Sequence, residues 1–139
     1  MACSSRTIIA TFAILLLTSS PISSAPAAQS LQSRISKPDP KKYQAIQDAK
    51  DWKNPFLVVH RDGIEILGVT PDGHSIPVGS VPQILDRLPD FAWPYGLVVA
   101  VQDNGVSAQG DSPRIKANRE KLLALLRELG VTTELWPSA

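Results

Sequence analysis

Five consecutive apolar residues, Leu97 to Val101, constrain the fold of this chain more than any other segment. A strand that is apolar on both faces is typical of the centre of a sheet. A loop follows and leads into the longest predicted helix, which Ser112 or Asp111 caps and Gly130 ends. Val131 to Trp136 is then predicted as the last strand. Because a strand–helix–strand crossover is right-handed, these two strands should be parallel.

A second β region is predicted earlier in the chain. Phe56 to Val59 is continuously apolar, and Ile64 to Val69 contains a second apolar run. Arg61-Asp62-Gly63 between them favours either a hairpin turn or a bulge within one long bent strand.

Two shorter helices accompany these strands. Asp39 is positioned to cap the first, with Pro40 at its opening position. Tyr43, Ile46 and Ala49 then recur at three-residue steps along one side. This helix should end before the Pro that precedes the first apolar run.

The second short helix begins at Ser80, whose spacing to Gln83 is that of a capping box, and it stops before Pro89. Together these elements predict a small two-layer α/β (α+β) sandwich. Its mixed sheet should have about four strands, with helices packed on it.

The first 27 residues have the layout of a secretory signal peptide. Arg6 supplies a positive charge, Thr7 to Thr18 is apolar, and Ala25-Pro26-Ala27 provides small residues before a cleavage site. Since a proline just past the cut disfavours cleavage after Ala25, we expect the cut after Ala27. The apolar run is about half of the ~20 residues that span a bilayer, so no membrane span is expected in the mature chain. The sequence divides into a signal peptide at 1–27, a flexible leader at 28–39 and one small domain at 40–139.

Charge and cysteine content narrow the classes of partner. The chain has 14 Lys and Arg against 13 Asp and Glu, and Arg6 is the only charged residue of the predicted signal peptide. The mature chain is therefore neutral, which argues against nucleic acid as a partner, since binding to phosphates needs a basic face. The single cysteine, Cys3, lies in the signal peptide, so a disulfide-free mature domain is expected.

The order of these elements resembles the periplasmic domain of the biopolymer-transport ExbD/TolR family. The resemblance implies the fold and an envelope interaction role. It does not extend to energy coupling, because the apolar segment here lacks the membrane carboxylate of that family. The matching pieces are Leu57-Val58-Val59 with Asp62-Gly63-Ile64, Pro71-Asp72-Gly73 before Ile76-Pro77-Val78, the helix through Ile84 and Leu88, the strand Leu97 to Val101, and Leu126-x-x-Leu129-Gly130 before the last strand.

One set of residues suggests hydrolytic chemistry. His60 and Asp62 alternate along a predicted strand and would share a face, as a general base and its carboxylate do. Ser112, within Gly110-Asp111-Ser112, is a candidate nucleophile of the kind found in GDS-type esterases. The simpler interpretation places His60 and Asp62 at a solvated strand end and makes Ser112 a helix cap. No catalytic residue is therefore assigned.

Three aromatic residues form the other candidate site. Trp93, Tyr95 and Trp136 lie beside a turn and near the chain end, where they would form a recognition patch or seal the ends of the sheet. His60 and His74 are too few for a zinc site, so neither a metal nor a cofactor is predicted.

The predicted function is therefore that of an exported, non-catalytic binding domain, periplasmic or extracellular. Its partner would be an envelope protein, a polymer or a second copy of the chain. Two alternatives remain: a small secreted hydrolase that uses His60, Asp62 and a serine such as Ser112, and a membrane-tethered assembly subunit that retains its N-terminal segment.

Overall fold

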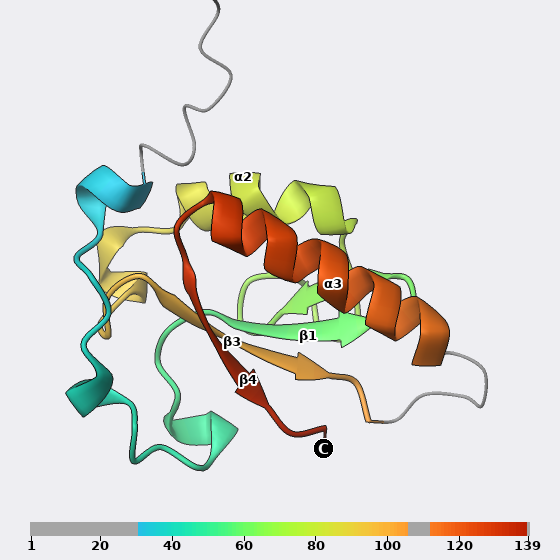
Figure 1. Ribbon diagram of the computed structural model, residues 1–139, viewed down its shortest axis with the longest axis horizontal. Helices are drawn as coiled ribbons and strands as arrows, with labels where there is room; N and C mark the ends of the chain where they lie inside the picture. The colour runs from blue at the N-terminus through green and yellow to red at the C-terminus, as the bar shows by residue number, and fades with distance from the viewer. Residues whose placement is uncertain (1–30, 106–111, 139) are drawn as a thin grey trace, which may run out of the picture.

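Four strands form one mixed sheet in the order β2-β1-β3-β4 (Figure 1). The computed structural model describes residues 31–105 and 112–138. Strands β1 and β2 are antiparallel, whereas β3 is parallel to both β1 and β4. The small α/β domain with a mixed sheet of about four strands is thus confirmed. The strands are β1 (Phe56–His60), β2 (Gly63–Ile66), β3 (Val98–Asp103) and β4 (Thr132–Trp136).

The two longer helices, α2 (Val81–Arg87) and α3 (Ser112–Glu128), both lie on one face of the sheet (Figure 1). The predicted capping box on α2 is wrong, because Ser80 makes no side-chain cap hydrogen bond. Ser80 is the last residue of a 3-10 turn, η3 (Val78–Ser80), and its backbone is already helical. A helical backbone at that position prevents the side chain from folding back onto the first turn.

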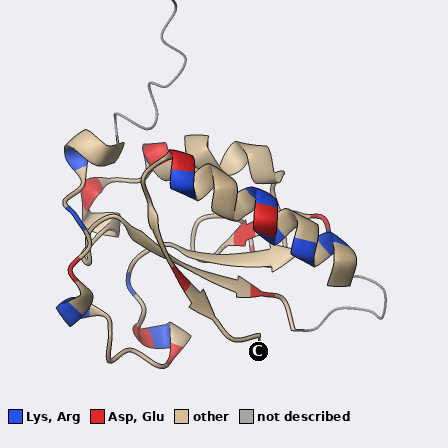
Figure 2. Ribbon diagram, viewed as in Figure 1, with Lys and Arg blue, Asp and Glu red and all other residues tan. Residues whose placement is uncertain are grey.

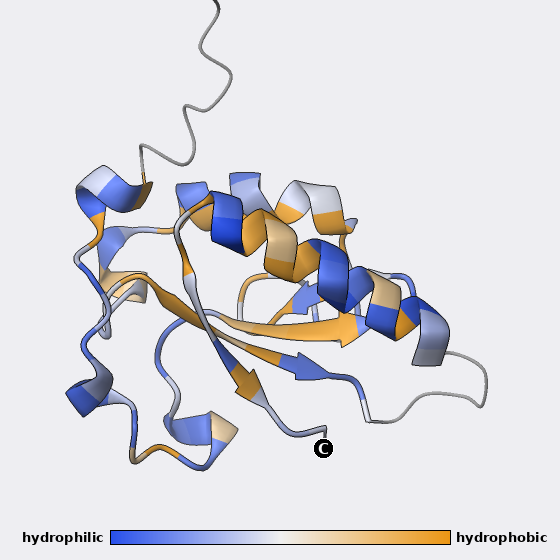
Figure 3. Cartoon of the chain, in the orientation of Figure 1, coloured by the Kyte–Doolittle hydropathy of each residue, from blue (hydrophilic) through white to orange (hydrophobic). Residues whose placement is uncertain are grey.

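The main core fills the space between the sheet and these helices. Alternate residues of β1 and β3, Leu57, Val59, Val99 and Val101, point into it with the apolar stripe of α3. Figure 3 shows the same division, with hydrophobic residues concentrated in β1, β3 and one side of α3. Ile115, Leu122 and Leu126 form the buried stripe of α3, and Leu129, just after the helix, is buried with them.

The opposite face of the sheet carries a second, aromatic cluster. Val98 and Ala100 of β3 point into it and are fully buried. Five rings cover them, with centroids 5.2–6.0 Å apart and mostly edge-to-face, an arrangement that aromatic pairs prefer. The rings are those of Tyr43, Trp52, Phe56, Tyr95 and Trp136.

The segment that brings Tyr43 and Trp52 to this face is not the helix that the sequence predicts. It forms two separate 3-10 turns, η1 (Pro40–Lys42) and η2 (Ala49–Asp51). Asp39 does cap the first turn, as expected, but Asp48 caps the second by accepting a hydrogen bond from the Lys50 amide at 3.0 Å. Such local aspartate bonds compete with helix continuation.

Asn54 fastens this segment to the start of β3. Its side chain is buried, and its Nδ2 donates to the carbonyl oxygens of Gly96 and Val98, both at 2.7 Å. Its Oδ1 accepts from the Tyr95 amide at 2.9 Å. A buried amide satisfied at three points fixes the segment in one position.

Residues 31–39 differ from the flexible leader that the sequence predicts. We call them the N-terminal strap. Leu31 and Ile35, four residues apart at a helical turn, are buried in the main core. The Leu97 amide donates to the Ser36 carbonyl, and the Asp39 amide donates to the Tyr95 carbonyl, both at 2.9 Å. The segment is polar in overall composition, but its two apolar residues lie on the same side of a helical turn and can therefore be buried together.

Gly96 makes the close approach of the strap possible. It has φ +86°, and a Cβ there would meet the Lys37 carbonyl oxygen. We expect Gly96→Ala to lower the free energy of unfolding by about 2 kcal/mol or more, through backbone strain and displacement of the strap. Urea denaturation measures this change.

Gly73→Ala is the matched control, because Gly73 has φ +73° but nothing lies within 4 Å of its Cβ position. It should cost only the backbone strain, about 1 kcal/mol. Equal losses in the two variants would show that the strap is not packed against Gly96.

Tyr43 should make the fold sensitive to alkali. Burial raises the pKa of its hydroxyl above the usual value of about 10, and the carboxylates of Glu134 and Asp39 add to the shift. The neutral phenol therefore stabilises the fold at all pH values below about 10, and this contribution is lost as the pH rises through the folded-state pKa. The free energy of unfolding should fall above pH 10 by at most about 1.4 kcal/mol per pH unit for this group.

The Tyr43→Phe variant should lack this component, as urea denaturation at several values between pH 9 and pH 11 would show. An unchanged slope in the variant would contradict the assignment.

Candidate functional site

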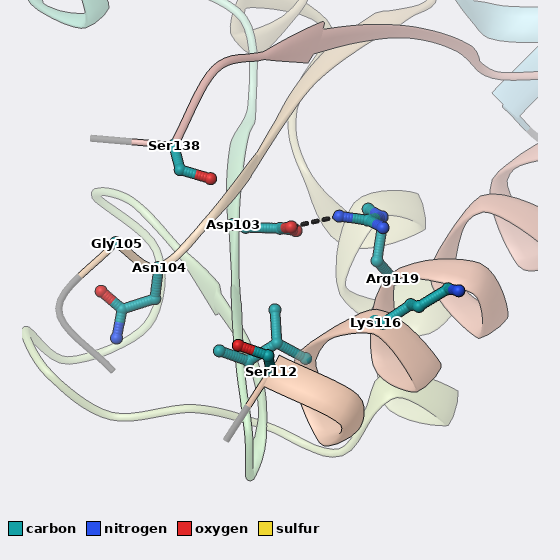
Figure 4. A pocket seen from close by; sticks show the side chains of 8 residues that line it. Asp103, Asn104, Gly105, Ser112, Lys116, Arg119 and Ser138 are labelled. Atoms are coloured by element: carbon teal, nitrogen blue, oxygen red, sulfur yellow. Dashed lines mark hydrogen bonds and ion pairs between the residues drawn. The ribbon is translucent and has the colours of Figure 1, made fainter. Parts of the chain in front are cut away.

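The hydrolase hypothesis directs attention to a polar cleft of about 390 Å³ at the carboxyl end of β3. Figure 4 shows that its side chains come from the end of β3, from the first turns of α3 and from the residues after β4. The labelled residues are Asp103, Asn104, Gly105, Ser112, Lys116, Arg119 and Ser138. Such a position, beyond the carboxyl ends of parallel strands, is where α/β proteins often bind ligands.

An ion pair occupies the inner part of this cleft. The Arg119 guanidinium contacts a carboxylate oxygen of Asp103 (Figure 4). The Asp103 side chain is largely buried, and its other oxygen has no hydrogen-bond partner among the residues that the structure describes. The guanidinium therefore neutralises a largely buried carboxylate, and its role in the fold leaves less of its charge to attract a ligand.

His60 does not form the predicted pair with Asp62. His60 ends β1, whereas Asp62 lies in the tight turn before β2 and faces Arg61 at 3.5 Å. The carboxylate that contacts His60 is that of Glu65, whose Oε2 lies 2.8 Å from the Nε2 of His60. The hairpin, one of the two geometries that the sequence allowed, produces this arrangement because it places β2 directly beside β1.

The other ring nitrogen of His60 is also occupied. Its Nδ1 lies 3.1 Å from the Asn104 side-chain amide. Asn118 of α3 donates to the backbone carbonyls of His60 and Arg61, at 2.8 and 3.0 Å. These bonds join the β1–β2 turn, the end of β3 and α3, so they hold the fold together.

Ser112 is the first residue of α3 and lines the polar cleft, but His60 does not. Both ring nitrogens of His60 meet other side chains, and none of the described serines pairs with this histidine through its hydroxyl. Gly110 and Asp111 lie outside the described residues. The arrangement favours a structural role for His60 over that of a general base.

The three predicted aromatic binding residues do not form one patch. Trp93 is buried in the main core and Tyr95 in the aromatic cluster on the other face of the sheet. Trp136 is half-buried and packs against Phe56 and Trp52. For Trp93 and Tyr95 this placement favours the alternative, in which they seal the two sides of the sheet.

Trp136 leads to a different surface, the outer edge of β4. The sheet has two edge strands, β2 and β4, and they differ in the backbone pairing of their outer sides. At the β2 edge, Ile64 and Ile76 exchange two backbone hydrogen bonds of 2.8 Å. Among the described residues, no strand or bridge pairs with the outer side of β4.

The direction of the β4 backbone follows from its pairing with β3. The Thr132 amide donates to the Leu97 carbonyl at 3.0 Å, so Thr132 and the residues two and four further on face β3. Thr133 and Leu135 alternate with them. Their N–H and C=O groups therefore point to the open edge, where a further strand would bind.

Two grooves of mixed lining flank this edge, one on each face of the sheet. The groove on the aromatic side has a volume of about 330 Å³ and that on the helical side about 260 Å³. Leu135 borders both and is 63% exposed. The first groove is lined by Ile46, Gln47, Glu134, Leu135, Trp136 and Pro137, and the second by Leu123, Arg127, Val131, Thr133 and Leu135.

Charge does not mark out a ligand site. Figure 2 shows Lys and Arg interspersed with Asp and Glu along the chain. In the described part of the chain, no three His, Cys, Asp or Glu side chains gather closely enough to hold a metal ion. Nor does any helix within residues 31–105 and 112–138 have the length and hydropathy to cross a bilayer.

Comparison of the chain with protein-family models, with curated proteins and with solved structures finds no match. The resemblance to the ExbD/TolR family therefore stays a prediction from the order of elements.

Sequence reasoning found Trp136 but missed Thr133 and Leu135. The available signal was the segment Thr132-Thr133-Glu134-Leu135, which is far more polar than Leu97 to Val101. A strand of that composition is typical of an edge, and a leucine within it is a candidate for an exposed contact.

Substitution of Arg119 tests whether the cleft ion pair supports the fold. We expect Arg119→Met to lower the free energy of unfolding by about 1–2 kcal/mol, because it leaves the carboxylate of Asp103 unpaired. Lys116→Met, on the same helix and cleft but exposed, should change it by less than about 0.5 kcal/mol. Equal stabilities of the two variants in urea denaturation would rule out the structural role.

Proposed function

We propose that this chain is an exported, non-catalytic interaction domain that binds an extended segment along the outer edge of β4. One observation carries the proposal: Ile76 closes the β2 edge, whereas no described segment pairs with the outward backbone groups of Thr133 and Leu135 in β4. Strand addition is a recurrent mode of peptide recognition. Main-chain hydrogen bonds supply its affinity, and pockets for alternate side chains supply its specificity.

The exposed leucine on this edge supports this interpretation. Proteins usually protect a free edge strand with lysine, proline, a bulge or a covering segment. The described part of β4 instead presents Leu135, one of the few large hydrophobic side chains that are exposed. An open edge with an exposed leucine next to two grooves is suited to contact with a partner.

The absence of a catalytic role is part of the proposal. His60 and Arg119 engage Glu65 and Asp103 respectively, and these contacts support the fold. Export is proposed from the signal-peptide layout of residues 1–27. The class of partner is an envelope protein or polymer, or a second copy of the chain.

Site-specific photo-cross-linking in intact cells tests the edge. A photoreactive phenylalanine analogue is placed at position 135 of the full chain, and at position 91 as a matched control. Phe91 is also exposed, at 86%, but lies in η4 (Asp90–Ala92), away from β4. We expect a discrete adduct from position 135 and none from position 91.

A backbone variant connects any adduct to strand addition. Thr133→Pro removes an N–H that points away from β3, and proline is tolerated on edge strands. It should abolish the adduct while a cooperative thermal transition is retained. An adduct that survives this change, or the lack of any adduct at position 135, would overturn the proposed binding mode.

Export is tested on the same material. We expect the intact mass of the protein recovered from the cells to lack residues 1–27, with Ala28 as the first residue. A full-length product that begins at Met1 would favour the membrane-tethered alternative.

A further inference from the structure

The edge of β4 is self-complementary, which identifies a specific occupant. Resting on the proposed function, we propose that the strand added to β4 is the β4 of a second copy. The two strands would run antiparallel about a two-fold axis through Thr133. The product would be a continuous eight-stranded sheet, four strands from each copy.

Backbone geometry allows only a few two-fold registers. Thr133 and Leu135 both point outward, so either can lie on the axis as a hydrogen-bonded pair with its own copy. An axis through Leu135 would set Thr133 opposite Pro137, which lacks an N–H. An axis through Glu134 would set two carboxylates directly opposite each other, which is destabilising. The axis through Thr133 avoids both costs. It leaves one hydrogen bond in each Leu135–Val131 pair, because the Val131 N–H already donates to the Leu126 carbonyl of its own copy.

In this register Leu135 meets apolar surface. Counting outward from Thr133, Leu135 of one copy lies opposite Val131 of the other. Val131 lines the groove on the helical side, together with Leu123 and Arg127. The exposed leucine and the groove that would receive it thus belong to the same edge, which is the condition for an isologous contact.

Charge on α3 follows the same symmetry. Glu120, Leu123 and Arg127 lie on one stripe of the helix, at spacings of three and four residues. Leu123 and Arg127 border the groove, and Glu120 and Arg127 are exposed. Reversal of this stripe by the two-fold axis brings Glu120 of one copy toward Arg127 of the other. The acid–leucine–base order is therefore complementary to itself.

A cysteine scan of β4 reads both the association and its register. Because only a residue on the axis lies opposite itself, Thr133→Cys should form an intermolecular disulfide. The Cα separation of a hydrogen-bonded pair is about 5.5 Å, within the range that a disulfide spans. Under the same register the two copies of residue 135 are about 14 Å apart, too far to be bridged.

The experiment uses the full chain with Cys3→Ser, so that the introduced cysteine is the only one. Thr133→Cys, Glu134→Cys and Leu135→Cys are oxidised mildly and analysed on a non-reducing gel. We expect a covalent dimer from Thr133→Cys alone. A dimer from Glu134→Cys or Leu135→Cys in its place would overturn the register, and no dimer from any of them would overturn self-pairing.

Sedimentation equilibrium provides a second measurement without cysteines. Leu135→Asp should raise the dimer dissociation constant at least about tenfold, because each copy loses a buried leucine contact. Phe91→Asp, the matched control, should leave it unchanged. Equal constants for the two variants, or a monomer at every concentration of the unaltered chain, would refute the dimer.

The photo-cross-link separates failure of this inference from failure of the proposed function. An adduct from position 135 with twice the mass of the chain supports self-pairing. An adduct that contains a different protein retains the open edge as the binding site but overturns self-pairing. No adduct at position 135 overturns both.

Discussion

The structure depends on the double-sided burial of β3. Val98 and Ala100 point to one face of the sheet, and Val99 and Val101 to the other; all four are essentially inaccessible to water. Within residues 31–105 and 112–138 there are two longer helices, α2 and α3, and both cover the same face. The other face must be covered by irregular chain, and this requirement explains the aromatic cluster and the position of Asn54. Without that cover, the residues of the second face would be exposed and the strand could not remain central.

The same requirement shapes the ends of the sheet. The N-terminal strap and the segment that follows it cover the amino end of β3 and the aromatic face of the sheet. The segment after β2 returns to close the β2 edge through Ile76. Among the described residues no segment reaches the far side of β4. The open edge is therefore a consequence of how the covering segments are distributed.

Much of this fold could be predicted from local pattern. Helix α3 and the central strand could be predicted, because the signal of each lies within one continuous segment of the chain. The strap could not be predicted, since Leu31 and Ile35 gain their role only by packing into the main core with residues far away in the sequence. The same applies to His60, whose partner Glu65 was decided by the hairpin register. Pairings across strands depend on topology, which composition and spacing do not specify.

The contrast between the polar cleft and the β4 edge identifies where binding free energy is available. In the cleft, Asp103 and Arg119 already satisfy much of each other's charge, so a ligand would have to compete with an existing ion pair. At the edge, the outward N–H and C=O groups of Thr133 and Leu135 have no partner in the described chain. A partner strand would therefore displace only water from them and would break no existing pairing. Backbone pairing alone does not distinguish one partner strand from another. Specificity must come from the two grooves, because alternate side chains of the added strand would enter them. Those on one face would pack against Trp136, and those on the other against Leu123.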